Sequence, residues 1–406
     1  MAVLVFATLD TKGREAAFVC TELRAAGVEA LLVDCGSLRE PQVAADIGRE
    51  ELFRAAETTP VALRAAGDRG TAVNAAARGA AALARRFHDE GRLEGVLGLG
   101  GSAGTTIGTA AMRALPLGVP KLMVSTLASG SVAHYVGSSD LLMMSAVVDI
   151  AGLNRISRTV LARAAQAMAG MVRGALPPRG ADERPIVAAT MFGVTTPCVE
   201  RARAALETAG FEVLVFHATG TGGRTMEALI DSGMVNGVLD ATTTELADEL
   251  VGGVLSAGPE RLTAAARAGI PQVVSVGALD MVNFLAFESV PARFAGRRLH
   301  RHNANVTLMR TTPEENARLG AEIGRKLSEA KGPVTVLLPL RGVSAIDREG
   351  QPFDDPEARE ALFSGIRGTR PGLEVVELDL HINDESFADA IALQLLRHLG
   401  SRSPVR

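Results

Sequence analysis

The sequence predicts an α/β fold made of two three-layer αβα subdomains with mainly parallel sheets. Short β-type runs alternate with Ala-rich helical runs along the 406 residues, which is the pattern of strands alternating with helices. The strand candidates are apolar throughout, as expected for strands that are buried on both faces. The two halves also repeat similar segments in the same order, which indicates internal duplication.

Each element is predicted from its local composition. β-branched and leucine-rich runs bounded by turn residues predict strands at Val3–Phe6, Glu29–Val33, Gly95–Leu97, Lys121–Val124, Ile186–Ala189, Glu212–Phe216, Val235–Leu239, Gln272–Val276, Val334–Leu338 and Leu373–Leu378. Apolar residues at helical spacing predict helices at Glu15–Ala26, Ala72–Glu90, Arg158–Arg173, Val199–Ala209, Pro259–Ala268, Glu314–Ala330 and Glu385–Leu399.

The evidence for duplication is a set of matches in register. Residues 23–33, LRAAGVEALLV, match residues 206–216, LETAGFEVLVF. Gly95–Leu97 likewise matches Gly237–Leu239, and a Gly-Val-Pro or Gly-Ile-Pro triplet precedes a strand in each half. Glycine recurs wherever a helix stops, but matches in a conserved order favour duplication over that generic signal.

The predicted boundary between the halves is the segment Gly174–Pro185, which is rich in proline and charge and is typical of a linker. We therefore expect an N-terminal nucleotide-binding subdomain at residues 1–178 and a C-terminal subdomain at residues 179–406. Ligands often bind at domain interfaces, so a cleft between the two is the expected place for a small molecule.

Composition excludes several classes of protein. The net charge of −4 is too mild for a nucleic-acid-binding surface, and aromatic residues, at 3%, offer few faces for stacking bases. The three cysteines form no C-x-x-C pair, which fits a reducing cytoplasm and gives no metal-site spacing. The uncharged runs 95–112 and 122–139 are too rich in Gly, Ser and Thr for membrane spans. We expect a cytoplasmic protein that binds neither nucleic acid nor membrane.

Two loops of the first half have phosphate-binding character, because ligands of parallel sheets bind outside the carboxyl ends of strands. After the first strand comes TLDTKG, with one carboxylate, two hydroxyls and a lysine at residues 8–13. After the strand at Gly95–Leu97 comes GLGGSAGTT, residues 98–106. Glycines let backbone N–H groups converge on phosphate at a helix start. The string lacks the later acidic residue of a dinucleotide fingerprint and is not a P-loop.

A third loop, STLASGS at residues 125–131, follows the next strand and would lie beside the glycine-rich loop. Ser129, His134 and Asp140 have the residue types of a catalytic triad, but spacing alone cannot support one. His134 is better interpreted as a hydrogen-bonded structural residue or a residue at the edge of a ligand site.

The second half contributes acid–base candidates. Asp240 and Glu245 flank a run of threonines after a strand, and His302 belongs to a His-x-His pair with His300. Such groups can transfer protons, so Asp240, Glu245 and His302 are the catalytic candidates. The His-x-His pair has no visible third ligand, so no metal site is predicted.

Several strings resemble one family: ATLDTKGRE, GLGGSAGTT, STLASG, VFHATGTGG, DATTTE and HNANVTLMRTT. They resemble the ATP-binding domain found at the N-terminus of the tomato mosaic virus resistance protein and alone in bacterial proteins. The resemblance covers about residues 2–400 and implies two Rossmann-like αβ subdomains, ATP binding and a homodimer. It implies nucleotide contacts from Asp10, Thr11, Lys12, Gly100, Gly101, Ser102, Gly104, Thr105, Ser129 and Gly130.

Three functions remain open from the sequence. The first is an ATP-binding protein, with Mg²⁺ held by phosphates and a carboxylate such as Asp10, that binds a second small molecule in the cleft. The second is a non-catalytic nucleotide-binding regulator. The third is an ATP-independent hydrolase, lyase or isomerase acting on a phosphorylated or carboxylated metabolite.

Overall fold

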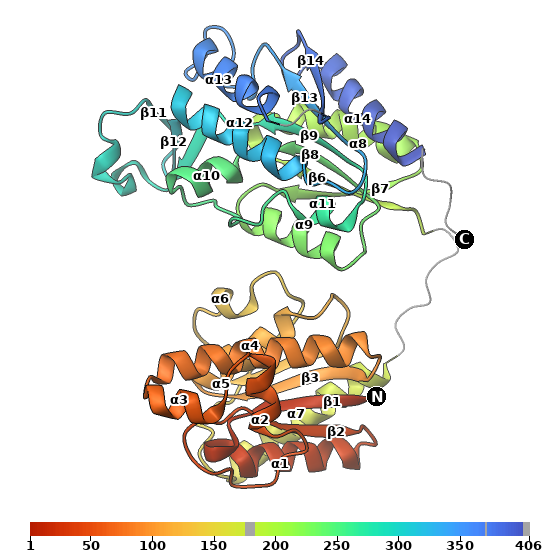
Figure 1. Ribbon diagram of the computed structural model, residues 1–406, viewed down its shortest axis with the longest axis vertical. Coiled ribbons are helices and arrows are strands. Elements are labelled where there is room, and N and C mark those ends of the chain that lie inside the picture. Colours follow the sequence, from red (N-terminus) through yellow and green to blue (C-terminus); the bar gives the residue numbers. More distant parts are fainter. Residues whose placement is uncertain (175–182, 370–371, 401–406) are drawn as a thin grey trace. The chain divides into compact units, whose positions relative to one another are not determined.

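The computed structural model describes residues 1–174, 183–369 and 372–400. The chain forms two compact units, residues 1–179 and residues 180–406, which are described one at a time (Figure 1). The expected linker, Gly174–Pro185, lies mostly outside the described residues. No helix in the described parts of the chain is both long enough and apolar enough to cross a bilayer.

Unit 1, residues 1–179, is built on a five-stranded sheet in the order β2-β1-β3-β4-β5. All its neighbouring strands pair in parallel. The strands are β1 (Ala2–Ala7), β2 (Ala30–Asp34), β3 (Leu93–Gly100), β4 (Lys121–Ser125) and β5 (Leu142–Ser145). The predicted parallel sheet is confirmed, with β5 as an added edge strand.

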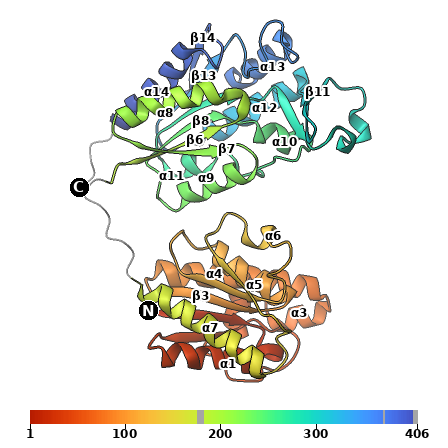
Figure 2. The same ribbon diagram turned by 180° about the vertical axis from the view of Figure 1, so that it is seen from behind.

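Helices cover both faces of this sheet. Val3 and Val5 of β1 point into the core under α1 and α7, whereas Leu4 and Phe6 point into the core under α2, α4 and α5, as strand alternation requires. Figure 2 shows α1 and α7 from their own side of unit 1. The helices are α1 (Leu9–Ala25), α2 (Arg49–Ala55), α3 (Pro60–Ala66), α4 (Arg69–Asp89), α5 (Ser102–Arg113), α6 (Ala133–Val136) and α7 (Arg155–Arg173).

Unit 2, residues 180–406, has a six-stranded parallel sheet in the order β14-β13-β9-β8-β6-β7. Its strands are β6 (Ile186–Met191), β7 (Glu212–His217), β8 (Gly237–Thr242), β9 (Gln272–Gly277), β13 (Val334–Pro339) and β14 (Glu374–Leu378). In chain order, the second strand of unit 2, β7, pairs with the first, β6, and β6 also pairs with the third, β8. Unit 1 has the same order, which supports the predicted duplication.

The helices of unit 2 also form two layers. One layer holds α8 (Thr196–Thr208) and α14 (Glu385–Gly400), whose apolar faces share a core with the sheet. The cores on the other face are shared by α9 (Thr221–Asp231), α10 (Glu245–Val251), α11 (Ala264–Ala268), α12 (Pro313–Leu327) and α13 (Pro356–Arg367).

Two features of unit 2 differ from the sequence prediction or were missed by it. A three-stranded antiparallel sheet in the order β10-β12-β11 was not predicted; it consists of β10 (Met281–Phe284), β11 (Leu299–Asn303) and β12 (Val306–Arg310). The predicted helix Pro259–Ala268 is wrong in its first half, since α11 begins at Ala264. Leu262 has φ 72°, which is incompatible with a helix at that position. The Glu227 carboxylate accepts the N–H groups of Leu262 and Thr263, the two residues before α11.

Candidate functional site

The candidate site in unit 1 lies where the strand order reverses. The chain passes from β1 to β2 on one side of β1, and β3 pairs with β1 on the other side. In sheets of this order, ligands bind outside the carboxyl ends of the strands at that switch point. The segments that begin there are α1, after β1, and α5, after β3 (Figure 1).

The segment after β1 is helical from Leu9, so the expected polar loop at residues 8–13 is instead the start of α1. Thr8 is the N-cap residue but makes no side-chain cap. Its hydroxyl shares a hydrogen bond of 2.9 Å with that of Thr11. Lys12 departs from helical geometry, and its ammonium donates to the Ile150 carbonyl. These contacts kink the first turn and hold Lys12 near the end of β1.

Asp10 has one engaged and one free carboxylate oxygen. Its Oδ2 accepts the N–H groups of Leu38 and Arg39, each at 3.3 Å, and so fixes the segment after β2. Its Oδ1 makes no hydrogen bond with the described residues. A carboxylate oxygen suits Mg²⁺, so Asp10 fits a single contact to that ion. No group of three or more His, Cys, Asp or Glu side chains in the described residues could hold a metal; other ligands would come from phosphate and water.

The segment after β3 presents open backbone donors. Gly101 is the N-cap residue of α5 and has no side chain with which to cap the helix. The N–H groups of Ser102, Ala103 and Gly104 donate to no acceptor among the described residues, as is usual for an uncapped first turn. A Cβ on Gly104 would lie 2.9 Å from the Leu99 carbonyl oxygen. Gly104 is therefore explained by the close packing of α5 against the end of β3. Thr105 is buried and shares a 2.7 Å hydrogen bond with the Ser125 hydroxyl, so its side chain joins α5 to β4.

The loop after β4 lies beside this segment, because the Thr126 N–H donates to the Gly100 carbonyl at 3.2 Å. Ser129 and Gly130 are exposed in it. The structure therefore brings the three sequence-predicted segments of unit 1 to neighbouring strand ends.

The hypothetical Ser-His-Asp triad is not formed. Asp140 instead pairs with the Lys121 ammonium and accepts the Gly118 N–H at 2.7 Å. The ring of His134 packs on that of Tyr135, with centroids 4.0 Å apart. Asp140 is therefore a partner of a buried lysine.

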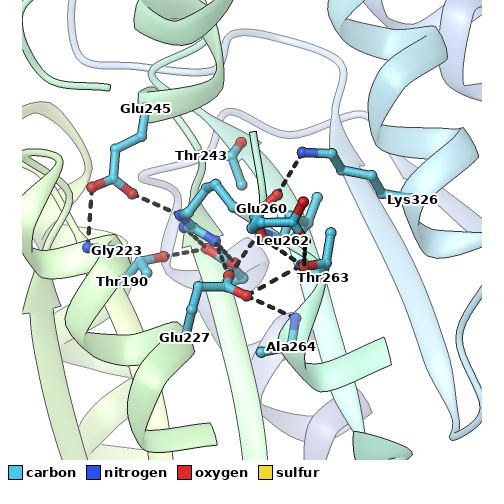
Figure 3. Close-up of polar contacts among 12 residues, drawn as sticks. Thr190, Gly223, Glu227, Thr243, Glu245, Glu260, Leu262, Thr263, Ala264 and Lys326 are labelled. Atoms are coloured by element: carbon cyan, nitrogen blue, oxygen red, sulfur yellow. Dashed lines mark hydrogen bonds and ion pairs between the residues drawn. The ribbon is translucent and has the colours of Figure 1, made fainter. Parts of the chain in front are cut away.

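In unit 2, Asp240 and Glu245 belong to a buried ion network centred on Arg261. Figure 3 shows Thr190, Glu227 and Glu245 around the centre of this network. Arg261 donates to Asp240 through both terminal nitrogens, at 2.5 and 2.7 Å, and its Nε donates to Glu245 at 2.7 Å. Thr190 adds a hydrogen bond of 2.7 Å to Asp240. Burial by itself lowers the pKa of Arg261, but Asp240, Glu245 and Glu227 raise it well above its usual value. The guanidinium therefore stays charged.

The other oxygen of Glu245 fills the second glycine-rich loop, residues 217–224. It accepts the N–H groups of Gly220 and Gly223 at 2.6 and 3.1 Å. These are the donors that a phosphate would need. A Cβ on Gly223 would lie 2.1 Å from the Glu245 carboxylate, so the fit is close. In unit 2 the Glu245 carboxylate therefore occupies the position that a bound phosphate would take.

The three catalytic candidates are not brought together. Asp240 and Glu245, both at most 1% exposed, share Arg261. His302 is exposed on β11, in the separate antiparallel sheet. Sequence reasoning missed Arg261, because it lies in a run that was predicted to be an ordinary helix. Nothing in its local run, GPERLTAAA, distinguishes it from an ordinary surface arginine.

Asp280 and Asp347 are a second pair of buried carboxylates in unit 2. Asp280 follows β9 and accepts the Ser344 hydroxyl at 2.8 Å, while Asp347 accepts Arg359 and Arg310 at 2.8 and 3.3 Å. Burial raises the pKa of both carboxyls. Arg310 is thus a buried cation between Asp347 and the loops around it.

The fold and the site define a class: an α/β protein of two doubly wound units, of which the first has an uncapped glycine-rich helix start at its switch point. The chain matches the model of the uncharacterised protein family UPF0261, with the N-terminal domain at residues 1–177 and the C-terminal domain at residues 184–399. It belongs to this family.

Relatives in bacteria and in tomato are similar over much of the chain. A UPF0261 protein of Clostridium tetani is 48% identical and covers 97% of this chain and 98% of its own. The UPF0261 protein RA0729 of Rhizobium meliloti is 51% identical and covers 96% of each. The ToMV resistance protein Tm-1(GCR237) of Solanum lycopersicum is 48% identical over 75% of this chain and 41% of its own length.

Proposed function

We propose that unit 1 binds ATP, with Mg²⁺, at the carboxyl ends of β1 and β3. The observation that carries the proposal is the start of α5, where Gly101 leaves the first-turn N–H groups without a side-chain cap. A helix N-terminus attracts anions through these donors and its dipole. The switch-point position and the sequence resemblance to an ATP-binding domain support the same ligand.

The neighbouring groups suit a phosphate chain. Thr8, at the start of α1, and Ser102, at the start of α5, are hydroxyl donors next to the ends of adjacent strands. The free Oδ1 of Asp10 suits a Mg²⁺ ion that bridges phosphate oxygens. Lys12 adds a positive charge, although its ammonium is shared with the Ile150 carbonyl.

We propose that the protein is a non-catalytic regulator that binds ATP, because Asp240 and Glu245 are already paired with Arg261. Both carboxylates are buried and paired with Arg261, so neither is free to exchange a proton with a substrate. A second small-molecule ligand, a homodimer and a cytoplasmic location stay predictions beside this proposal. The ATP-independent enzyme has no such observation in its favour.

Substitution of Gly101 by Asp separates ligand binding from folding. Gly101 has φ −84°, which any residue adopts, and a Cβ there would meet only the Thr126 hydroxyl, at 3.6 Å. Aspartate is also a good N-cap residue, so we expect the free energy of unfolding to change by no more than about 1 kcal/mol. Its carboxylate would occupy the phosphate donors, and titration calorimetry should detect no ATP binding.

Thr59→Asp is the matched control, because Thr59 is an exposed N-cap residue of α3, in a different helix of the same unit. It adds the same charge and should leave ATP affinity unchanged. Equal ATP affinity in Gly101→Asp and the wild type would disprove the site. ADP release by the wild-type protein at a steady rate would disprove the regulator.

A further inference from the structure

Val147 occupies a strained turn directly after β5. Its φ is +65°, a region that β-branched residues rarely adopt. The Val148 N–H donates to the Ala146 carbonyl at 2.7 Å, which closes a three-residue γ-turn of the rare, strained kind. The side chain is 71% exposed, so packing in the core does not explain why a valine stands there.

The turn lies two strands away from the proposed phosphate site. Gly100 of β3 is in register with Ser125 of β4, and Ser125 is in register with Ser145 of β5. Neighbouring strands are about 4.8 Å apart, so the end of β5 lies roughly 10 Å from the end of β3. A nucleotide spans such a distance between its phosphates and its base.

The segment after Val147 returns to the phosphate site. Before the turn, the Ala146 N–H donates to the Ser125 carbonyl at 3.0 Å. After it, the Ile150 carbonyl accepts the Lys12 ammonium, and the Gly152 N–H donates to Glu15 at 2.5 Å. Residues 146–152 therefore join the end of β5 to the first turns of α1 and border the ends of the strands between them.

We infer that Val147 contacts the base of the nucleotide and so contributes to selection of a nucleoside over bare phosphate. The inference rests on the proposed ATP site. Strained residues persist where the surrounding structure holds them, and they cluster at ligand sites. Ligand pockets pair a few polar groups with apolar ones; unit 1 supplies the polar groups at β1 and β3, and Val147 supplies an apolar side chain at β5.

The test compares ATP with inorganic tripolyphosphate, each with Mg²⁺, on the wild-type chain and on Val147→Gly. Glycine tolerates the positive φ, so the variant should melt at the same temperature as the wild type or above it. Its Kd for ATP should rise about fivefold, the loss expected for part of a valine contact. Its Kd for tripolyphosphate should not change, because the phosphate donors stay in place.

Glu57→Gly is the control for relief of strain, since Glu57 has φ 57° and is exposed beyond the end of α2. It should leave both affinities unchanged. Equal ATP affinity in Val147→Gly and the wild type overturns the inference, as does equal wild-type affinity for ATP and tripolyphosphate. Failure of the wild type to bind either one overturns the proposed function instead.

Discussion

Arg261 and Asp240 form a bidentate ion pair in which neither side chain is more than 1% exposed, with nitrogen–oxygen distances of 2.5 and 2.7 Å. Glu245 adds a second carboxylate on the Nε side of the guanidinium, at 2.7 Å. These two carboxylates, which the sequence marks as catalytic candidates, therefore share one buried cation in unit 2.

Loss of Arg261 should destabilise the protein severely. Arg261→Met leaves Asp240 and Glu245 buried without a counter-charge, which costs about 3–5 kcal/mol of the free energy of unfolding. Arg267→Met is the control: Arg267 pairs with Asp231 at 2.8 Å with both side chains about half exposed, which predicts a loss below about 1 kcal/mol. Denaturant unfolding measures both; equal losses would contradict the assigned role.

The chain should bind one nucleotide. The amides of Gly220 and Gly223 already donate to the carboxylate of Glu245, so two donors of the second glycine-rich loop are taken and the negative charge beside them repels phosphate. Titration calorimetry with ATP should give a stoichiometry near one per chain. A value near two would mean that ATP displaces Glu245, and Gly101→Asp would then retain the second site.

The two glycines at the start of α5, Gly101 and Gly104, should differ in how well they tolerate replacement by alanine. Gly104→Ala brings a Cβ within 2.9 Å of the Leu99 carbonyl oxygen, and such overpacking against backbone costs about 1–3 kcal/mol. Gly101→Ala meets only an ordinary contact at 3.6 Å and should change stability by less than about 1 kcal/mol. Thermal unfolding of the two variants checks this; the reverse order would contradict the close approach of α5 to the Leu99 carbonyl.

Asp248 should make stability fall as pH rises. Burial raises the pKa of Asp248 from 3.8 to about 7, so between these values the folded state binds a proton that the unfolded state has lost. The stabilisation is complete below about pH 4 and disappears as pH rises through 7. Compared with Asp248→Asn, the wild type should lose about 1–3 kcal/mol between pH 5 and pH 8.

The fold should accept the replacement Asp248→Asn. Asp248 accepts the Asn283 side-chain amide at 2.7 Å, and the side-chain Oδ1 of Asn283 has no hydrogen-bond partner among the described residues. If the Asn283 amide turns over, it can accept the new donor. Denaturant unfolding at the two pH values gives the comparison; parallel pH profiles for the wild type and the variant would show that Asp248 is ionised in the folded state.

The regular part of the fold was predictable, because its signals are local. The apolar strand at 186–189 and the helix at 314–330 were located to within a few residues of β6 and α12. Of the antiparallel strands, β11, LHRHN, was missed because it is polar and largely exposed and has no apolar alternation. The start of α1 was missed because Asp10 and Thr11 resemble cap residues, whereas Asp10 in fact accepts N–H groups beyond β2.

The sequence by itself determined the alternation of strand and helix, the duplicated order of elements and the glycine-rich segments that follow strands. These depend on periodicity and on residues close together in the chain. Only the tertiary structure decided which polar groups are free. Glu245 and Gly101 both lie at glycine-rich segments. Arg261 and the amides of Gly220 and Gly223 donate to the Glu245 carboxylate, whereas Gly101 leaves the first N–H groups of α5 without a side-chain cap. The difference arises because burial and pairing depend on partners that folding brings together from distant positions in the sequence.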